Sequence, residues 1–224
     1  MSPPTGETET NAVRAESTSS PREEFRPTRW FRWHLVAALA LFFASAFAAY
    51  ALVGTIPIEQ LEALLGDVQA ELPNDGPLPE LAFVPLLVNN LRALLLIGLG
   101  AVTGGALSVF GLVVNGALVG AVVSFAVRQT SWAIVLAALL PHGVLELPAF
   151  FMAASIGLRV PHRVLRWLLG WDETPLSRVE FVELAVISVL LAAMIAVAAW
   201  IEVNVTLDVV EWVAGDGALD PVNA

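Results

Sequence analysis

The segment "LLPHGVLELPAFFMA", residues 139–153, places a histidine and a glutamate in an otherwise apolar stretch. His142 and Glu146 are four residues apart, so on a helix both side chains lie on one face. An imidazole and a carboxylate at this spacing can pass a proton, hold a cation or form a polar contact between helices. Which chemistry applies depends on the elements that surround the pair.

The composition indicates that these elements lie in a membrane. Of 224 residues, 57% are hydrophobic and only 14% are charged, an apolar share above that of soluble domains. Apolar blocks of about membrane-spanning length lie at about 33–55, 84–105, 107–127, 132–157 and 181–201. Short turns join the three middle blocks and make them antiparallel neighbours. The predicted fold is all-α, a polytopic membrane bundle of about five transmembrane helices.

Arginine predicts the orientation of this bundle, because basic residues near the ends of spans stay on the cytoplasmic side. Nine of the eleven basic residues precede the first span or lie between the fourth and the fifth. We therefore expect a multi-pass protein of the cell membrane, with a cytoplasmic N-terminus and an external C-terminus. The nine are Arg14, Arg22, Arg26, Arg29, Arg32, Arg159, Arg163, Arg166 and Arg178.

The chain divides into three regions. Residues 1–29 are rich in Pro, Ser, Thr and Glu and predict a disordered cytoplasmic tail. Residues 30–204 form the transmembrane domain, including an outer amphipathic helix at about 57–72, where apolar residues recur at helical spacing. Residues 205–224 are expected to form an external C-terminal tail.

The charge balance and the lack of cysteine limit the classes of partner and of chemistry. A formal net charge of -10, with arginine as the sole basic residue type, suggests an acidic, salt-adapted protein and argues against nucleic acid as a partner. The chain has no cysteine, which excludes disulfides, thiolate metal ligands and cysteine nucleophiles.

Other polar residues fall at similar depths in the middle spans. Counting from the outer ends at 1.5 Å per residue, Arg92 lies near the level of His142, and Asn115 lies near the level of Glu146. A charge buried in the membrane costs about 2.5–3.5 kcal/mol, so Arg92 is expected to pair with Glu146. The predicted intramembrane polar cluster consists of Asn89, Asn90, Arg92, Asn115, His142 and Glu146.

Glycine spacing predicts where the helices approach closely. Gly100 with Gly104 and Gly116 with Gly120 have the small-xxx-small spacing of membrane helix contacts, and Gly143 is assigned to the same packing role. Proline within the fourth span, at positions 141 and 148, predicts a kink near His142.

Three interpretations of the polar cluster remain open: a structural clasp between helices, a proton, ion or small-ligand site, and a catalytic site. Catalysis has the least support, since a zinc enzyme needs a third ligand and the other histidines, His34 and His162, lie at the far ends of their spans. Ser108 and Ser155 are also expected far from His142. No enzymatic activity, cofactor or metal is therefore expected.

Three runs, "VNNLRALLL", "LVVNGALVG" and "LLPHGVLELPAFFMAASIGLRV", resemble the stage II sporulation protein M family of integral membrane proteins over residues 85–160. The Pro-His-Gly-x-x-Glu run is the most specific part of the resemblance. The matching positions are Asn89, Asn90, Asn115, Gly116, Pro141, His142, Gly143 and Glu146.

The resemblance implies a membrane scaffold, because the family's namesake recruits peptidoglycan-degrading partners in spore formers, whereas relatives in other organisms have no settled role. The leading hypothesis is a non-enzymatic scaffold or accessory subunit. The alternative is a small transporter or channel-like component in which His142 and Glu146 handle a proton or cation. The expected partners are the lipid bilayer, membrane or cell-envelope proteins and a second copy of the chain.

Overall fold

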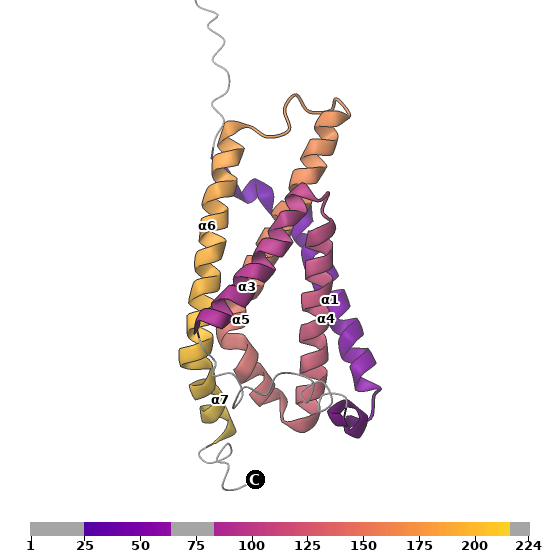
Figure 1. Cartoon of the computed structure of the whole chain (residues 1–224), viewed down its shortest axis with the longest axis vertical. Helices are drawn as coiled ribbons and strands as arrows, with labels where there is room; N and C mark the ends of the chain where they lie inside the picture. The colour runs from indigo at the N-terminus through magenta and orange to yellow at the C-terminus, as the bar shows by residue number, and fades with distance from the viewer. Residues whose placement is uncertain (1–24, 64–82, 216–224) are drawn as a thin grey trace, which may run out of the picture.

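The computed structural model describes residues 25–63 and 83–215, and within these ranges every regular element is helical (Figure 1). The elements are η1 (Pro27–Trp30), α1 (Arg32–Gly54), α3 (Phe83–Gly98), η2 (Leu99–Val102), α4 (Ala106–Gln129), α5 (Trp132–Leu168), α6 (Arg178–Ile201), η3 (Glu202–Thr206) and α7 (Leu207–Ala214). The segment η3 is a π-helix that joins α6 to α7.

Five helices are long and apolar enough to cross a membrane, which confirms the predicted all-α fold. They comprise Arg32–Gly54, Phe83–Val102, Ala106–Gln129, Trp132–Leu168 and Arg178–Ala214. The last two, with 37 residues each, are longer than the apolar blocks that predicted them. Residues 205–214, expected in a tail, continue the last helix because their apolar residues keep a helical period, and Val210 is buried.

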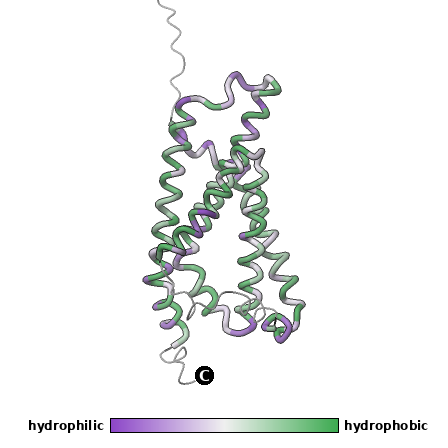
Figure 2. The backbone as a smooth tube through the Cα atoms, in the orientation of Figure 1, coloured by the Kyte–Doolittle hydropathy of each residue, from purple (hydrophilic) through white to green (hydrophobic). Residues whose placement is uncertain are grey.

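α5 lies at the centre of the packing. It contacts α1, α3, α4, α6 and α7, while α1 lies along α4. Phe42 of α1 and Phe151 of α5 meet edge to face, with ring centroids 5.1 Å apart. Figure 2 shows hydrophobic colour along most of each spanning helix, and many large apolar side chains are exposed. Such an apolar exterior is typical of a lipid-facing bundle.

The two ends of the bundle differ in charge. The start of α1, the end of α5 and the start of α6 share the end at the top of Figure 1, and α7 lies at the bottom. We call the top the arginine-rich end, because its described segments carry Arg26, Arg29, Arg32, Arg159, Arg163, Arg166 and Arg178. That this end faces the cytoplasm stays a prediction.

Part of the loop that follows α1 is helical at the opposite end of the bundle. Residues 58–63 are helical, as predicted, and the rest of the 57–72 segment lies outside the described residues. Arg128 donates from Nη1 to the carbonyl oxygens of Val53 and Ile56, at 3.2 and 2.9 Å, and so satisfies acceptors near the end of α1. Gln129 donates to Glu62 at 2.9 Å.

Candidate functional site

His142 and Glu146 lie one turn apart on α5, and η3 brings Glu202 to them. The three side chains each offer one ligand atom, and these atoms all lie within 4.8 Å of one another. α5 contacts both η3 and α7, which fixes the end of the last helix beside the pair. A histidine and two carboxylates from two separate helical segments thus form one group.

Glu202 occupies an irregular stretch of helix. A π-helix adds a residue to a turn, and such turns frequently occur at functional sites. The structure places the first residue of η3 among the residues of α5. Sequence analysis missed Glu202 because it follows the last apolar block and was assigned to the end of the domain. An acidic residue directly after an apolar block was the one feature of the sequence that could have pointed to Glu202.

A cavity of about 160 Å³ adjoins the pair on α5. Asn115 of α4 lines it with His142 and Glu146, and the Asn115 Nδ2 donates to the Gly111 carbonyl at 2.8 Å. The amide is therefore oriented by its own helix. The remaining lining is almost entirely apolar: Phe42, Val119, Leu139, Gly143, Leu147 and Phe150.

Within the described residues the group has no polar partners. No hydrogen bond or ion pair involves the side chain of Glu146 or Glu202 there, and the buried Nδ1 of His142 is also without a hydrogen-bond partner. Two carboxylates this close repel each other unless a proton or a cation lies between them. The arrangement therefore suits the binding of a positive charge.

The expected Arg92–Glu146 pair is not formed, and this prediction was wrong. Arg92 is exposed on α3, and among the described residues no ion pair joins it to a carboxylate. The prediction matched the two residues by depth but did not consider the direction in which α3 presents its side chains. Arg92 instead lies on the exterior of the bundle.

The predicted polar cluster therefore divides. Asn90 is buried and accepts from Asn89 Nδ2 at 3.4 Å, while Asn89 is exposed. Both side chains are absent from the lining of the cavity. The structure brings together Asn115, His142 and Glu146, adds Glu202, and leaves the two α3 asparagines and Arg92 elsewhere.

The glycines also fall into two groups. A methyl group at Gly120 would overlap the Ala46 carbonyl, and one at Gly116 would overlap Ser45 and Phe42, so both allow the backbones of α1 and α4 to approach. A methyl at Gly100 would meet Ser108. By contrast, Gly104 and Gly143 have open space around an added Cβ, and Gly104 adopts a φ of 66° in the turn before α4.

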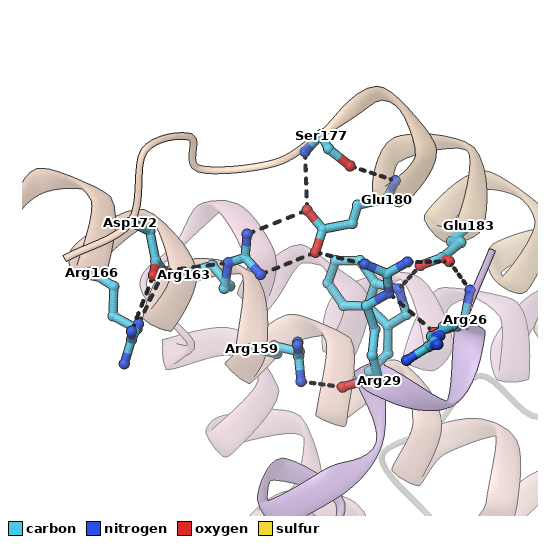
Figure 3. Close-up of polar contacts among 10 residues, drawn as sticks. Arg26, Arg29, Arg159, Arg163, Arg166, Asp172, Ser177, Glu180 and Glu183 are labelled. Atoms are coloured by element: carbon cyan, nitrogen blue, oxygen red, sulfur yellow. Dashed lines mark hydrogen bonds and ion pairs between the residues drawn. The ribbon is translucent and has the colours of Figure 1, made fainter. Parts of the chain in front are cut away.

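A second polar group, at the arginine-rich end, was not predicted (Figure 3). Glu183 of α6 is fully buried and accepts from the indole of Trp30 and a guanidinium nitrogen of Arg29, each at 2.9 Å, and from the backbone nitrogen of Arg26. Ser155 donates to the Trp30 carbonyl at 2.6 Å. Residues 26–29, expected to be disordered, are therefore held against α5 and α6. The isolated acid in "FVELAV" was the available signal.

Two further carboxylates extend this group. Glu180 closes a capping box with Ser177 and accepts from Arg163 at 3.1 Å. Asp172, in the loop after α5, accepts two hydrogen bonds from Arg166, at 3.0 and 3.1 Å (Figure 3). The hydrogen bond from Arg166 lowers the pKa of Asp172 below its usual value.

The five long apolar helices define a class, the multi-pass helical membrane proteins. A family model described as stage II sporulation protein M matches residues 38–207, and the chain belongs to that family. The chain is also 31% identical over 137 residues to an uncharacterized protein of Methanocaldococcus jannaschii, a match that covers 61% of this chain and 77% of that protein. No solved structure matches the chain significantly.

Proposed function

We propose that this protein binds a divalent cation within the membrane and acts as a small transporter or channel-like component. One observation carries the proposal: the ligand atoms of His142, Glu146 and Glu202 lie within 4.8 Å of one another beside a cavity. The role is non-enzymatic, since binding and release of an ion require no covalent step.

The ligand types favour a transition-metal ion. Two ionised carboxylates balance a charge of +2, and an imidazole nitrogen is a common ligand of zinc, iron and related ions but is rare around calcium or magnesium. Tetrahedral ligands about 2.0–2.2 Å from zinc lie roughly 3.5 Å from one another. Side-chain movement on the order of 1 Å would bring the three groups to that spacing.

The binding test compares charge-neutral variants at the site with a matched variant outside it. Purified protein is dialysed against Zn²⁺ or Mn²⁺, and bound metal is counted by mass spectrometry. We expect one ion per chain in the wild type, and affinity lower by roughly tenfold or more in Glu146→Gln and Glu202→Gln. Glu211→Gln, on the exposed side of α7, should bind as the wild type does.

The transport test uses the same proteins in liposomes that contain a metal-sensitive dye. Uptake by the wild type and the Glu211→Gln control, but not by the two site variants, supports the proposal. Binding without uptake would leave a structural ion and contradict the transport role. If no metal binds, but a proton leak measured with an internal pH dye disappears in Glu146→Gln, the cation is a proton.

The second candidate function is an accessory subunit or scaffold, and an exposed arginine on the exterior of α3 favours it. Arg92 is a charged side chain exposed between exposed apolar residues, Val88 and Leu95. A charge facing lipid is costly, whereas a carboxylate of a partner helix or second copy would stabilise it. Cysteine cross-linking from Val88→Cys in native membranes tests this. A specific cross-linked species that Arg92→Leu abolishes supports the candidate, and its absence contradicts it.

A further inference from the structure

A second cavity, of about 320 Å³, lies at the arginine-rich end, far from the His/Glu/Glu site along α5. Its walls come from the start of α1, the last turns of α5 and the loop that follows α5. Four arginines and two histidines line it: Arg32, Arg159, Arg163, Arg166, His34 and His162. Asp172 is the one acidic residue in this lining.

The carboxylates near this cavity do not balance its positive charge. Asp172 pairs with Arg166 at 3.0 Å and lies 3.7 Å from Arg163, which also pairs with Glu180 at 3.1 Å. No carboxylate among the described residues lies within ion-pair distance of Arg32 or Arg159. Two guanidinium charges therefore face the cavity without a counter-ion from this part of the chain.

Several buried nitrogen atoms of the lining residues also have no hydrogen-bond partner within the described residues. Arg159 Nη1 donates to the backbone carbonyl of Arg29, but its Nε has no hydrogen-bond partner within the described residues. The Nε of Arg163 forms no hydrogen bond there either, although it lies 3.7 Å from an oxygen of Asp172. His34 Nε2 lies 3.1 Å from His162 Nδ1, while the buried Nδ1 of His34 is likewise without a partner there. An unsatisfied buried donor such as Arg159 Nε indicates an acceptor that the described part of the fold does not supply.

The position of the cavity indicates the source of that acceptor. Arg32 is the first residue of α1 and Arg166 lies in the last turn of α5, so the cavity lies where two spanning helices leave the apolar layer. Trp33, which lines the cavity, is 83% exposed, and the nearby Trp171 is 66% exposed. Tryptophan at this level is typical of the headgroup region of a bilayer.

We propose that this cavity binds a phosphate group, supplied by the headgroup of an anionic phospholipid. Guanidinium groups match phosphate oxygens with paired hydrogen bonds, and basic pockets between membrane helices bind anionic headgroups in this way. Arg32 and Arg159 supply the uncompensated charge, and the histidine pair supplies a further donor. The lipid would tie α1 to the end of α5.

Native mass spectrometry of the protein in detergent tests the proposal with three additions: phosphatidylglycerol, phosphatidylcholine and inorganic phosphate. The wild type should retain one phosphatidylglycerol and far less phosphatidylcholine. In Arg32→Gln and in Arg32→Gln/Arg159→Gln, retention of phosphatidylglycerol should fall roughly tenfold or more, since charge-assisted hydrogen bonds are lost. Arg178→Gln is the matched control, because Arg178 is an exposed arginine at the same end that does not line the cavity.

Each outcome decides the proposal. Equal losses in Arg178→Gln and Arg32→Gln would overturn it, since general attraction to positive charge would then explain retention. Equal retention of the two lipids in the wild type would overturn it as well. Binding of inorganic phosphate without phosphatidylglycerol would keep the phosphate site but overturn the lipid as its source. If the double variant does not fold, Arg32→Gln decides alone, because its side chain is exposed.

Discussion

Glu183 and Glu202 lie on the same continuous last helix, and their surroundings are opposite. Glu183 is fully buried and accepts hydrogen bonds from three groups at the arginine-rich end. Glu202 lies beside another carboxylate and a histidine, with no hydrogen bond or ion pair inside the described residues. The first carboxylate is saturated by contacts within the fold, whereas the second has unused acceptor oxygens, which the proposed cation would engage.

The largest expected effect comes from neutralising the saturated carboxylate. Glu183→Gln removes the charge that holds Arg29, and breaking a buried pair by removing one partner costs about 3–5 kcal/mol. Unfolding in detergent, followed by circular dichroism, measures the loss. Glu173→Gln, an exposed acid in the loop before α6, serves as the control. Equal stability of the two variants would show that the contacts of Glu183 contribute little.

The next largest loss of stability is expected from a steric change at the contact between α1 and α4, two of the helices that line the cavity. Gly120→Ala places a methyl group on the Ala46 carbonyl and must separate α1 from α4, at a cost of about 1–3 kcal/mol. Gly143→Ala meets open space and should leave stability within about 0.5 kcal/mol of the wild type. Thermal unfolding of both variants in the same detergent compares them. A more stable Gly120→Ala protein would contradict the close approach.

A smaller change in stability is expected at Arg92 and Glu146, which the sequence predicted to form a buried ion pair. In a double-mutant cycle with Arg92→Met and Glu146→Gln, the coupling energy should be below about 0.5 kcal/mol, because the two side chains form no ion pair. Glu146→Gln alone should leave the unfolding free energy unchanged or raised, since it relieves repulsion by Glu202. A coupling of about 3 kcal/mol or more would mean that Arg92 reaches Glu146 after all.

The smallest expected change in stability concerns Asp172, at the edge of the arginine-rich end. The pKa of Asp172 is lowered, chiefly by the hydrogen bond from Arg166. A lowered pKa in the folded state stabilises the protein above the usual aspartate pKa, about 3.9, and this contribution is lost as the pH falls through the folded-state pKa. Asp172→Asn should therefore unfold like the wild type in strong acid and be slightly less stable at neutral pH. Parallel curves at all pH values would contradict this.

The sequence predicted the helices well because their signal is local. Length and apolar composition are sufficient to identify a spanning helix, and the structure has one at each predicted block. Two of the three residues of the candidate site were predicted in the same way, since His142 and Glu146 share a helical face. The third, Glu202, depends on a contact between α5 and η3, and no periodicity within one segment reports such a contact.

The errors share a physical origin. Depth along a helix follows from counting residues, but direction around the axis and tilt depend on packing, so Arg92 was assigned to an interior that it does not face. The first residues of the chain were judged by composition alone. Residues 26–29 are nevertheless fixed, because a buried acid more than 150 positions later accepts their hydrogen bonds.

The π-helix η3 has one more residue in its turn than an α-helix has, and this residue changes the rotation of the helix that follows. Each residue turns a regular helix by about 100°, so a chain without the insertion would present a different side to α5 beyond Ile201. Glu202 lies beside His142 and Glu146 of α5, α7 also contacts α5, and Val210 of α7 is buried, so the offset decides which side of α7 meets α5. The length of this turn thus sets the direction in which the side chains of α7 point. Removing one residue from Glu202–Thr206 would rotate α7 by about 100° and turn its present contact face away from α5, although the sequence of α7 would be unchanged.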